Sequence, residues 1–152
     1  MKKILFLLSA AIMLFASCEG PAGRDGLDEE TYWYVRNYTI RSNDWELVNG
    51  VDQIGSYYRA EIEIPQLDRE IYELGNVFCY MYYIDASGTE VQTLLPYIEH
   101  FGESTKVGEE LWTKTISCDF TRGSIMFYVQ YSDFFTGLEH PGTVRFRVVL
   151  NL

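Results

Sequence analysis

The chain has 152 residues, a formal net charge of −10 and a sequence pI of about 4.6. An acidic surface is repelled by phosphate backbones and by anionic lipid headgroups, so the composition argues against nucleic acid as a partner and against adsorption to anionic lipid. The 12 tyrosines favour a β-sheet protein with large side chains in its core, with a Tyr/Trp surface for sugars or proteins as the alternative.

The first residues have the order of a secretion signal. Lys2 and Lys3 precede an apolar stretch over residues 4–15, which as a helix would span roughly 18 Å and is too short to cross roughly 30 Å of hydrocarbon. Small residues then lead into Cys18, in a pattern that resembles the lipobox of bacterial lipoproteins. We therefore predict a lipoprotein signal peptide over residues 1–17 and lipidation of Cys18 by diacylglycerol and acyl chains such as palmitate. The alternative is a plain secretion signal in which this cysteine is incidental.

Residues 18–30 lack hydrophobic periodicity and are rich in glycine and acids. Gly20, Gly23 and Gly26 recur at every third position, but so few triplets cannot hold a collagen triple helix. We interpret this segment as a flexible acidic tether between the acylated cysteine and one domain over residues 31–152.

The rest of the chain alternates short β-rich runs with turn signals, which is typical of a sandwich or a barrel. A helical turn or two is predicted within residues 66–74, and loops are predicted over residues 99–110 and 133–142. The predicted strands cover residues 32–40, 45–48, 56–64, 77–84, 90–98, 111–120, 124–132 and 143–152.

Two of these runs show which side chains face the core. Tyr58, Ala60, Ile62 and Ile64 alternate with charged residues, and the last run alternates in the same way, with Val144, Phe146, Val148 and Leu150 inward. Short connections favour antiparallel pairing of neighbours. We expect an all-β fold, an antiparallel immunoglobulin-like β-sandwich of about eight strands with one short helical turn, and a closed β-barrel as the alternative.

Reactive constellations are not evident in the sequence. His100 and His140 lie in predicted loops without metal-binding spacing, and we expect no metal and no cofactor. Cys79 and Cys118 lie inside apolar runs, where two buried thiols are favoured over a disulfide, although an exported protein can form one.

Aromatic side chains are the candidates for binding. Phe134 and Phe135 lie together in a loop between two strands, where they either form a contact surface or fold back onto the core. Trp45 and Trp112 are further candidates, with a role as core anchors as the alternative.

Several segments together resemble a family. CEGPAG after the signal, SNDWEL at residues 42–47, LPY at residues 95–97, GSIMFYV at residues 123–129 and RFRVVL at residues 145–150 are similar to the small uncharacterised lipoproteins of gut Bacteroidales. The resemblance implies a lipidated cysteine, a collagen-like tether, a compact β domain and an outer-membrane location, on the periplasmic side or at the cell surface. It implies no residues of function.

We therefore expect a lipid-anchored outer-membrane protein that is not an enzyme and that binds an envelope protein or glycan. One alternative is a glycan-acting hydrolase that uses carboxylates around Glu99, Glu103 and Glu109. Another is a structural or pilus-like subunit that donates a terminal strand to a neighbouring copy.

Overall fold

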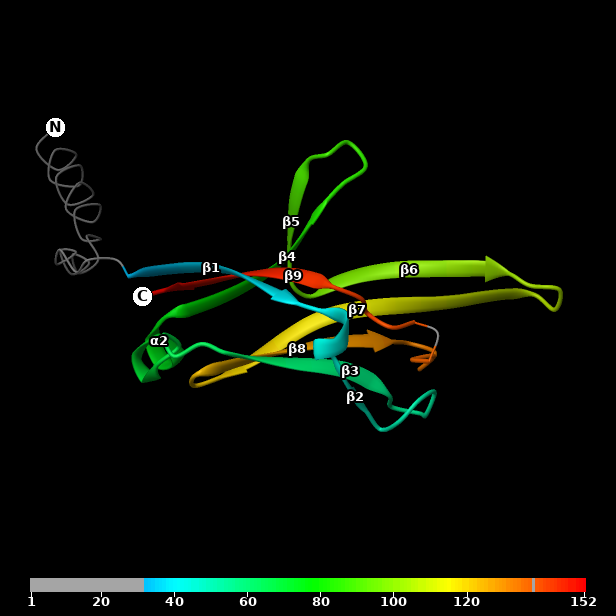
Figure 1. The fold of residues 1–152 in the computed structure, drawn as a ribbon, viewed down its shortest axis with the longest axis horizontal. Coiled ribbons are helices and arrows are strands. Elements are labelled where there is room, and N and C mark those ends of the chain that lie inside the picture. The colour runs from blue at the N-terminus through cyan, green and yellow to red at the C-terminus, as the bar shows by residue number, and fades with distance from the viewer. Residues whose placement is uncertain (1–31, 138) are drawn as a thin grey trace, which may run out of the picture. The chain divides into compact units, whose positions relative to one another are not determined.

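The computed structural model describes residues 32–137 and 139–152, so the predicted signal peptide, Cys18 and the tether lie outside the described residues. The described part is built almost entirely of strands (Figure 1). None of its helices is long and apolar enough to cross a membrane. The elements are β1 (Trp33–Ile40), η1 (Ser42–Asp44), β2 (Glu46–Val48), β3 (Tyr57–Glu63), α2 (Arg69–Leu74), β4 (Asn76–Ile84), β5 (Glu90–Leu94), β6 (Tyr97–Ser104), β7 (Glu109–Thr121), β8 (Ser124–Tyr131) and β9 (Val144–Asn151).

The strands form two separate antiparallel sheets, which confirms the predicted all-β sandwich over a closed barrel among the described residues. The four-stranded sheet has the order β1-β9-β4-β5, and the five-stranded sheet has the order β2-β3-β8-β7-β6. Strands β2, β3, β8 and β7 have the order A-B-E-D of an immunoglobulin variable-type sandwich. Strands β5, β4, β9 and β1 have the order C′-C-F-G of its other sheet. One difference is that β1, from the N-terminal side, occupies the place beside β9 that a C-terminal strand G would fill.

The core lies between the two sheets. The residues predicted to face inward on β3 and β9 are buried there, apart from Ile62, which is partly buried. Phe127 of β8 stacks on Phe146 of β9 with ring centroids 4.1 Å apart, so a pair of aromatic rings joins the two sheets at the centre.

The short helix α2 covers one end of the sandwich. Asp68 caps it by accepting a hydrogen bond from the Ile71 N–H at 3.0 Å, and Gly75 ends it by donating to the Ile71 carbonyl at 2.9 Å. Leu67 and Ile71 are buried, whereas Leu74, the last residue of the helix, is 75% exposed.

The sequence prediction is wrong over residues 90–110. The predicted single strand 90–98 is two strands, because the chain leaves β5 at the cis Leu95–Pro96 bond and enters the other sheet as β6. The predicted loop 99–110 is mostly strand, since β6 and β7 pair from Tyr97 and Ile116 out to Ser104 and Glu109. The resulting β6–β7 hairpin extends beyond the other strands of its sheet (Figure 1).

Candidate functional site

The inner face of the five-stranded sheet changes character along β7. Ile116 is buried in the core, but further along β7 the inward positions hold Lys114, Trp112 and Glu110. Their partners on β6 are Glu99, Phe101 and Glu103, so the hairpin carries aromatic and charged side chains where the rest of the sheet carries aliphatic ones. This portion of the inner face is only partly covered.

A hollow of about 430 Å³ lies at this portion of the sheet. We call it the acidic hollow, because four carboxylate side chains and no basic ones line it. Its lining comes from the hairpin and from the β8–β9 loop: Glu103, Glu110, Leu111, Trp112, Asp133, Phe135 and Glu139.

The hairpin side of the acidic hollow has an aromatic support and a repulsive charge pair. Phe101 and Trp112 are opposite each other in the ladder and stack with ring centroids 5.6 Å apart and an interplanar angle of 13°. Glu103 and Glu110 are also directly opposite, which is an unfavourable position for like charges on neighbouring strands. A ligand that carries positive charge would relieve this repulsion.

The loop side is held in place by hydrogen bonds to the core. Thr136 is fully buried, its hydroxyl accepts a hydrogen bond from the Asp52 N–H at 3.0 Å, and its carbonyl accepts one from the Tyr58 hydroxyl at 2.7 Å. The Gly137 N–H donates to the Asp52 carboxylate at 2.7 Å. These hydrogen bonds hold residues 136 and 137 of the loop against Tyr58 in the core and Asp52 in the β2–β3 turn.

Two residues just before this anchor enter the acidic hollow. The Asp133 carboxylate accepts a hydrogen bond from the Phe135 N–H at 3.2 Å, which fixes the local turn. Phe135 is 51% exposed although it lies on a well-anchored loop. An exposed aromatic ring on a hydrogen-bonded loop is available for contact with a partner.

The negative charge of the site affects Tyr131, a nearby buried residue that does not line the acidic hollow. Tyr131 ends β8 and is almost fully buried. Burial raises the pKa of Tyr131 well above its usual value, and the carboxylates of Glu139, Asp133 and Glu99 raise it further. The carboxylates of the hollow and the hairpin therefore act together on one region.

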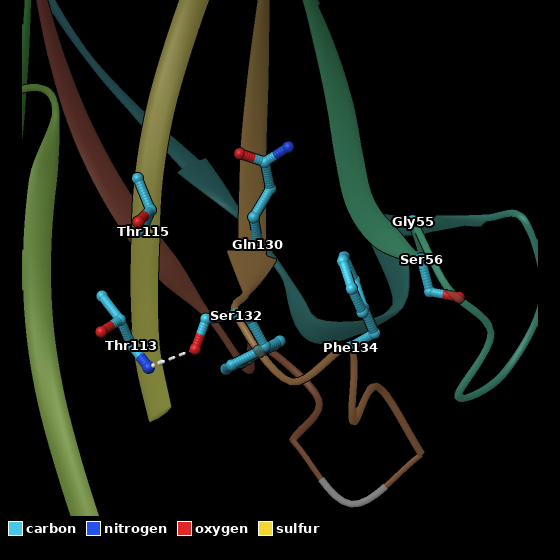
Figure 2. A pocket seen from close by; sticks show the side chains of 8 residues that line it. Gly55, Ser56, Thr113, Thr115, Gln130, Ser132 and Phe134 are labelled. Carbon is cyan, nitrogen blue, oxygen red and sulfur yellow. Dashed lines mark hydrogen bonds between the residues drawn. The ribbon is translucent and has the colours of Figure 1, made fainter. Parts of the chain in front are cut away.

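The two phenylalanines that the sequence predicted as a pair are separated. Phe134 adopts a positive φ of 62° and lines a different, more polar hollow of about 320 Å³ beside Ser56, Gln130 and Ser132 (Figure 2). Phe135 faces the acidic hollow with Trp112. Only Phe135 and Trp112, of the four predicted binding residues, meet at one place.

The two tryptophans also differ. Trp45 is 6% exposed, and its indole N–H donates to the Gly142 carbonyl at 2.9 Å, so it is a core residue and not a surface for binding. The indole nitrogen of Trp112 is buried and has no hydrogen-bond partner among the described residues. This donor is shielded from solvent, so Trp112 offers the hollow its ring surface and not its N–H group.

The cysteines contribute no reactive group to the hollow. Cys79 and Cys118 are free, and each lies within the sandwich, on opposite sheets. The hydrogen bond between the two thiols, together with burial, raises the pKa of Cys79 far above its usual range. Cys79 is buried and Cys118 is partly buried, while Cys18 lies outside the described residues.

The candidate catalytic and metal-binding side chains do not gather at one place among the described residues. Among residues 32–137 and 139–152, no group of three or more His, Cys, Asp or Glu side chains could hold a metal ion. Glu99, Glu103 and Glu109 lie on strands, and only Glu103 of these lines the acidic hollow. His100 lies on β6, where its Nδ1 is 3.0 Å from the Thr113 hydroxyl, and not in a loop as predicted.

Sequence reasoning missed Phe101, Glu110, Asp133 and Glu139 as members of this region. Tyr97, Glu99, Phe101 and Glu103 occupy alternate positions and share one face. Because two of these four side chains are charged, the hydrophobic pattern did not indicate a strand over these residues. Comparisons of the chain with protein-family models, with curated proteins and with solved structures find no match.

Proposed function

We propose that this protein is a lipid-anchored component of the bacterial outer membrane whose β-sandwich domain binds an envelope partner, a protein or a glycan, at the acidic hollow without altering it chemically. The observation that carries the proposal is the composition of the hollow. An exposed Phe135 and a stacked Trp112 stand beside four carboxylates, with no basic side chain in the lining.

Two features of the hollow are energetically unfavourable when no ligand is bound. Like charges at Glu103 and Glu110 cost stability, and the exposed ring of Phe135 buries less apolar surface than it could. Both features become favourable when a partner with complementary charge and apolar surface covers them. The hydrogen bonds that the β8–β9 loop makes to Asp52 and Tyr58 limit the conformational entropy that the loop loses on binding.

Peptide and glycan arrays probed with the purified domain test this proposal. Phe135→Ala is expected to weaken every array signal by about tenfold. Truncating a central aromatic residue of an interface typically costs about 1–2 kcal/mol. Phe120→Ala is the matched control, because Phe120 is 39% exposed and lies at the far end of β7. Equal signals for the two variants, or no signal from the wild type on either array, would refute the proposal.

Lipid anchoring is the second part of the proposal, and the resemblance to small lipoproteins of gut Bacteroidales supports it. Cys18→Ala is expected to move the protein from the membrane fraction to the soluble fraction after a carbonate wash. A Cys118→Ala variant, which leaves the predicted lipid site untouched, should stay with the membranes. A Cys18→Ala variant that still partitions with membranes would contradict the anchor.

A glycan hydrolase is a second candidate, because Glu103 and Glu110 face each other in a hollow. Glycosidases use paired carboxylates, one of which acts as a proton donor. If the hollow hydrolyses glycans, Glu110→Gln would abolish turnover of a substrate found on the array while leaving its binding largely intact. Binding that is lost together with the charge, with no turnover in the wild type, favours the non-catalytic function.

The strand-donating subunit has less support. Strand β9 lies between β1 and β4, and β1 pairs with β9 over its whole length, from Trp33 to Ile40. Both terminal strands are thus already paired within the domain.

A further inference from the structure

Strand β6 forms one edge of its sheet. It pairs with β7 on one side, and none of the other backbone hydrogen bonds of the described residues involves residues 97–104. An open edge of this length is a template for an additional strand.

The backbone groups that point outward from this edge follow from contacts on β7. The Ser132 N–H donates to the Thr113 carbonyl at 2.9 Å, and the Thr113 N–H donates to the Ser132 hydroxyl at 2.9 Å (Figure 2). Both backbone groups of Thr113 therefore point away from β6. Because His100 is opposite Thr113, this pair is a non-hydrogen-bonded one, and the N–H and carbonyl of His100 point to the open edge.

Alternation extends this assignment along the strand. The outward backbone groups belong to Ile98, His100, Gly102 and Ser104. The intervening residues bond to β7, and their side chains lie on the inner face: Tyr97, Glu99, Phe101 and Glu103. An added strand would thus place every second side chain against this aromatic and acidic row, next to the acidic hollow.

Building on the proposed binding at the hollow, we propose that the open edge of β6 accepts an extended basic segment of a partner polypeptide. Its Lys or Arg side chains lie against Glu99 and Glu103, and its apolar or aromatic side chains lie against Tyr97 and Phe101. Neighbouring strands are about 4.8 Å apart, so a long basic side chain opposite Glu103 also reaches toward Glu110 and the hollow.

Charge selects a basic strand over a second copy of this chain. The whole chain carries a formal charge of −10, and pairing β6 with another β6 would bring further carboxylates against Glu99 and Glu103. Inward-pointing charges on an edge strand oppose such self-association. The nearest bases on the hairpin are Lys114, which is already opposite Glu99, and Lys106 in the turn. Glu103 and Glu110 have no base in register with them.

The backbone selects a polypeptide over a small cation. A free polyamine would gain the attraction of the carboxylates but would leave the outward N–H and carbonyl groups of β6 to water. An extended peptide satisfies both, since main-chain hydrogen bonds supply affinity and alternate side chains supply specificity.

The probe is a fluorescent peptide in which Thr occupies the odd positions and Lys and Tyr alternate at the even ones, measured by anisotropy against the purified domain. In an antiparallel arrangement its even side chains face the row from Glu103 back to Tyr97. Three comparison probes are the same peptide with Glu in place of Lys, a version N-methylated at Thr, and a version N-methylated at Lys. The Thr amides would donate to β6 and the Lys amides would point away from it, so the two methylated peptides form a matched pair.

The Glu peptide and the Thr-methylated peptide should each bind with about tenfold or more lower affinity than the probe. The Lys-methylated peptide should lose less than about twofold. On the protein, His100→Pro removes an outward N–H without touching the β6–β7 ladder and should weaken binding by about tenfold, whereas His100→Ala should not. The double variant Glu103→Gln, Glu110→Gln should weaken binding and reduce its dependence on salt.

The inference is overturned if both methylated peptides bind equally, if the Glu peptide binds as tightly as the Lys peptide, or if light scattering shows a dimer that His100→Pro abolishes. Its failure is distinguishable from that of the proposed function. If methylation has no effect but Phe135→Ala still removes binding, the hollow binds its ligand without the edge and only this inference falls. If Phe135→Ala and Phe120→Ala bind every probe equally, the proposed function falls as well.

Discussion

Two regions of one sheet face have the same alternation of side chains but differ in composition and burial. Under the four-stranded sheet, the inward residues of β8 are Ile125, Phe127 and Val129, and all of them are fully buried. On the β6–β7 hairpin, the same face carries stacked Phe101 and Trp112 beside opposed glutamates. The first region stabilises the fold by burial, and the second is left open to solvent.

The composition of the inner face changes along the β6–β7 hairpin. Aliphatic side chains end where the covering sheet ends, and beyond that point aromatic and acidic side chains follow. A solvated strand needs neither stacked rings nor like charges in register, because ordinary polar residues satisfy it at lower cost. The open region is therefore where the protein departs from what its fold requires.

The largest change in the free energy of unfolding is expected for a substitution in the covered region. Phe127→Ala removes one ring of the pair that joins the sheets and should lower the free energy of unfolding by about 3–5 kcal/mol. Urea denaturation followed by far-UV circular dichroism measures this change. A loss below about 1 kcal/mol would mean that the sheets are not packed through this contact.

The corresponding change in the open region should cost much less. Phe101→Ala removes the partner of Trp112 in a stack that is only partly covered, and an aromatic pair contributes about 0.5–1.5 kcal/mol beyond its buried area. The same denaturation experiment compares it with Phe127→Ala. If the two variants lost equal stability, the distinction between a covered and an open region would be wrong.

The pH dependence of stability tests the environment of Tyr131, which lies at the end of β8. Its raised pKa means that the unfolded chain loses this proton near pH 10 while the folded protein keeps it. The associated stability is fully present below about pH 10 and is lost as the pH rises toward the folded pKa. Tyr131→Phe should therefore reduce the alkaline loss of stability, moving its midpoint upward by about half a pH unit.

Denaturation midpoints between pH 8 and pH 11 measure this change, roughly one unfolding curve per half unit. Tyr72→Phe is the control, because Tyr72 is exposed on α2. Identical pH profiles for wild type and Tyr131→Phe would show that the pKa of the buried hydroxyl is not raised in the folded protein.

The smallest expected effect has the opposite sign. Glu110→Gln relieves the repulsion with Glu103 and should raise the free energy of unfolding by about 0.2–0.5 kcal/mol at low salt. Glu109→Gln is the control, since Glu109 is opposite Ser104 and has no such repulsion to relieve. A loss of stability in Glu110→Gln would remove the argument that the site is unfavourable without a ligand.

Much of the fold was predictable because its strands alternate in the ordinary way. On β9 the apolar residues Val144, Phe146, Val148 and Leu150 face inward between outward arginines, and the prediction for this strand is confirmed. The strand predicted over residues 77–84 is confirmed as β4.

The candidate site was less predictable for a physical reason. Hydrophobic periodicity identifies a strand through the core it helps to bury, and β6 faces a hollow with Glu99 and Glu103 instead. The sheet switch at Leu95–Pro96 and the separation of Phe134 from Phe135 depend on backbone geometry that the sequence pattern does not encode. Phe135 and Trp112 could be named as aromatic candidates but not placed together.

The most direct test of this account follows the indole N–H signals of Trp112 and Trp45 in ¹H–¹⁵N spectra while the alternating Lys and Tyr peptide is titrated into the domain. Trp112 lines the acidic hollow, whereas Trp45 is buried and bonded to Gly142, so it serves as an internal control. The Trp112 signal is expected to shift and saturate while the Trp45 signal stays in place. A saturating titration that moves only Trp45, or neither signal, would contradict it.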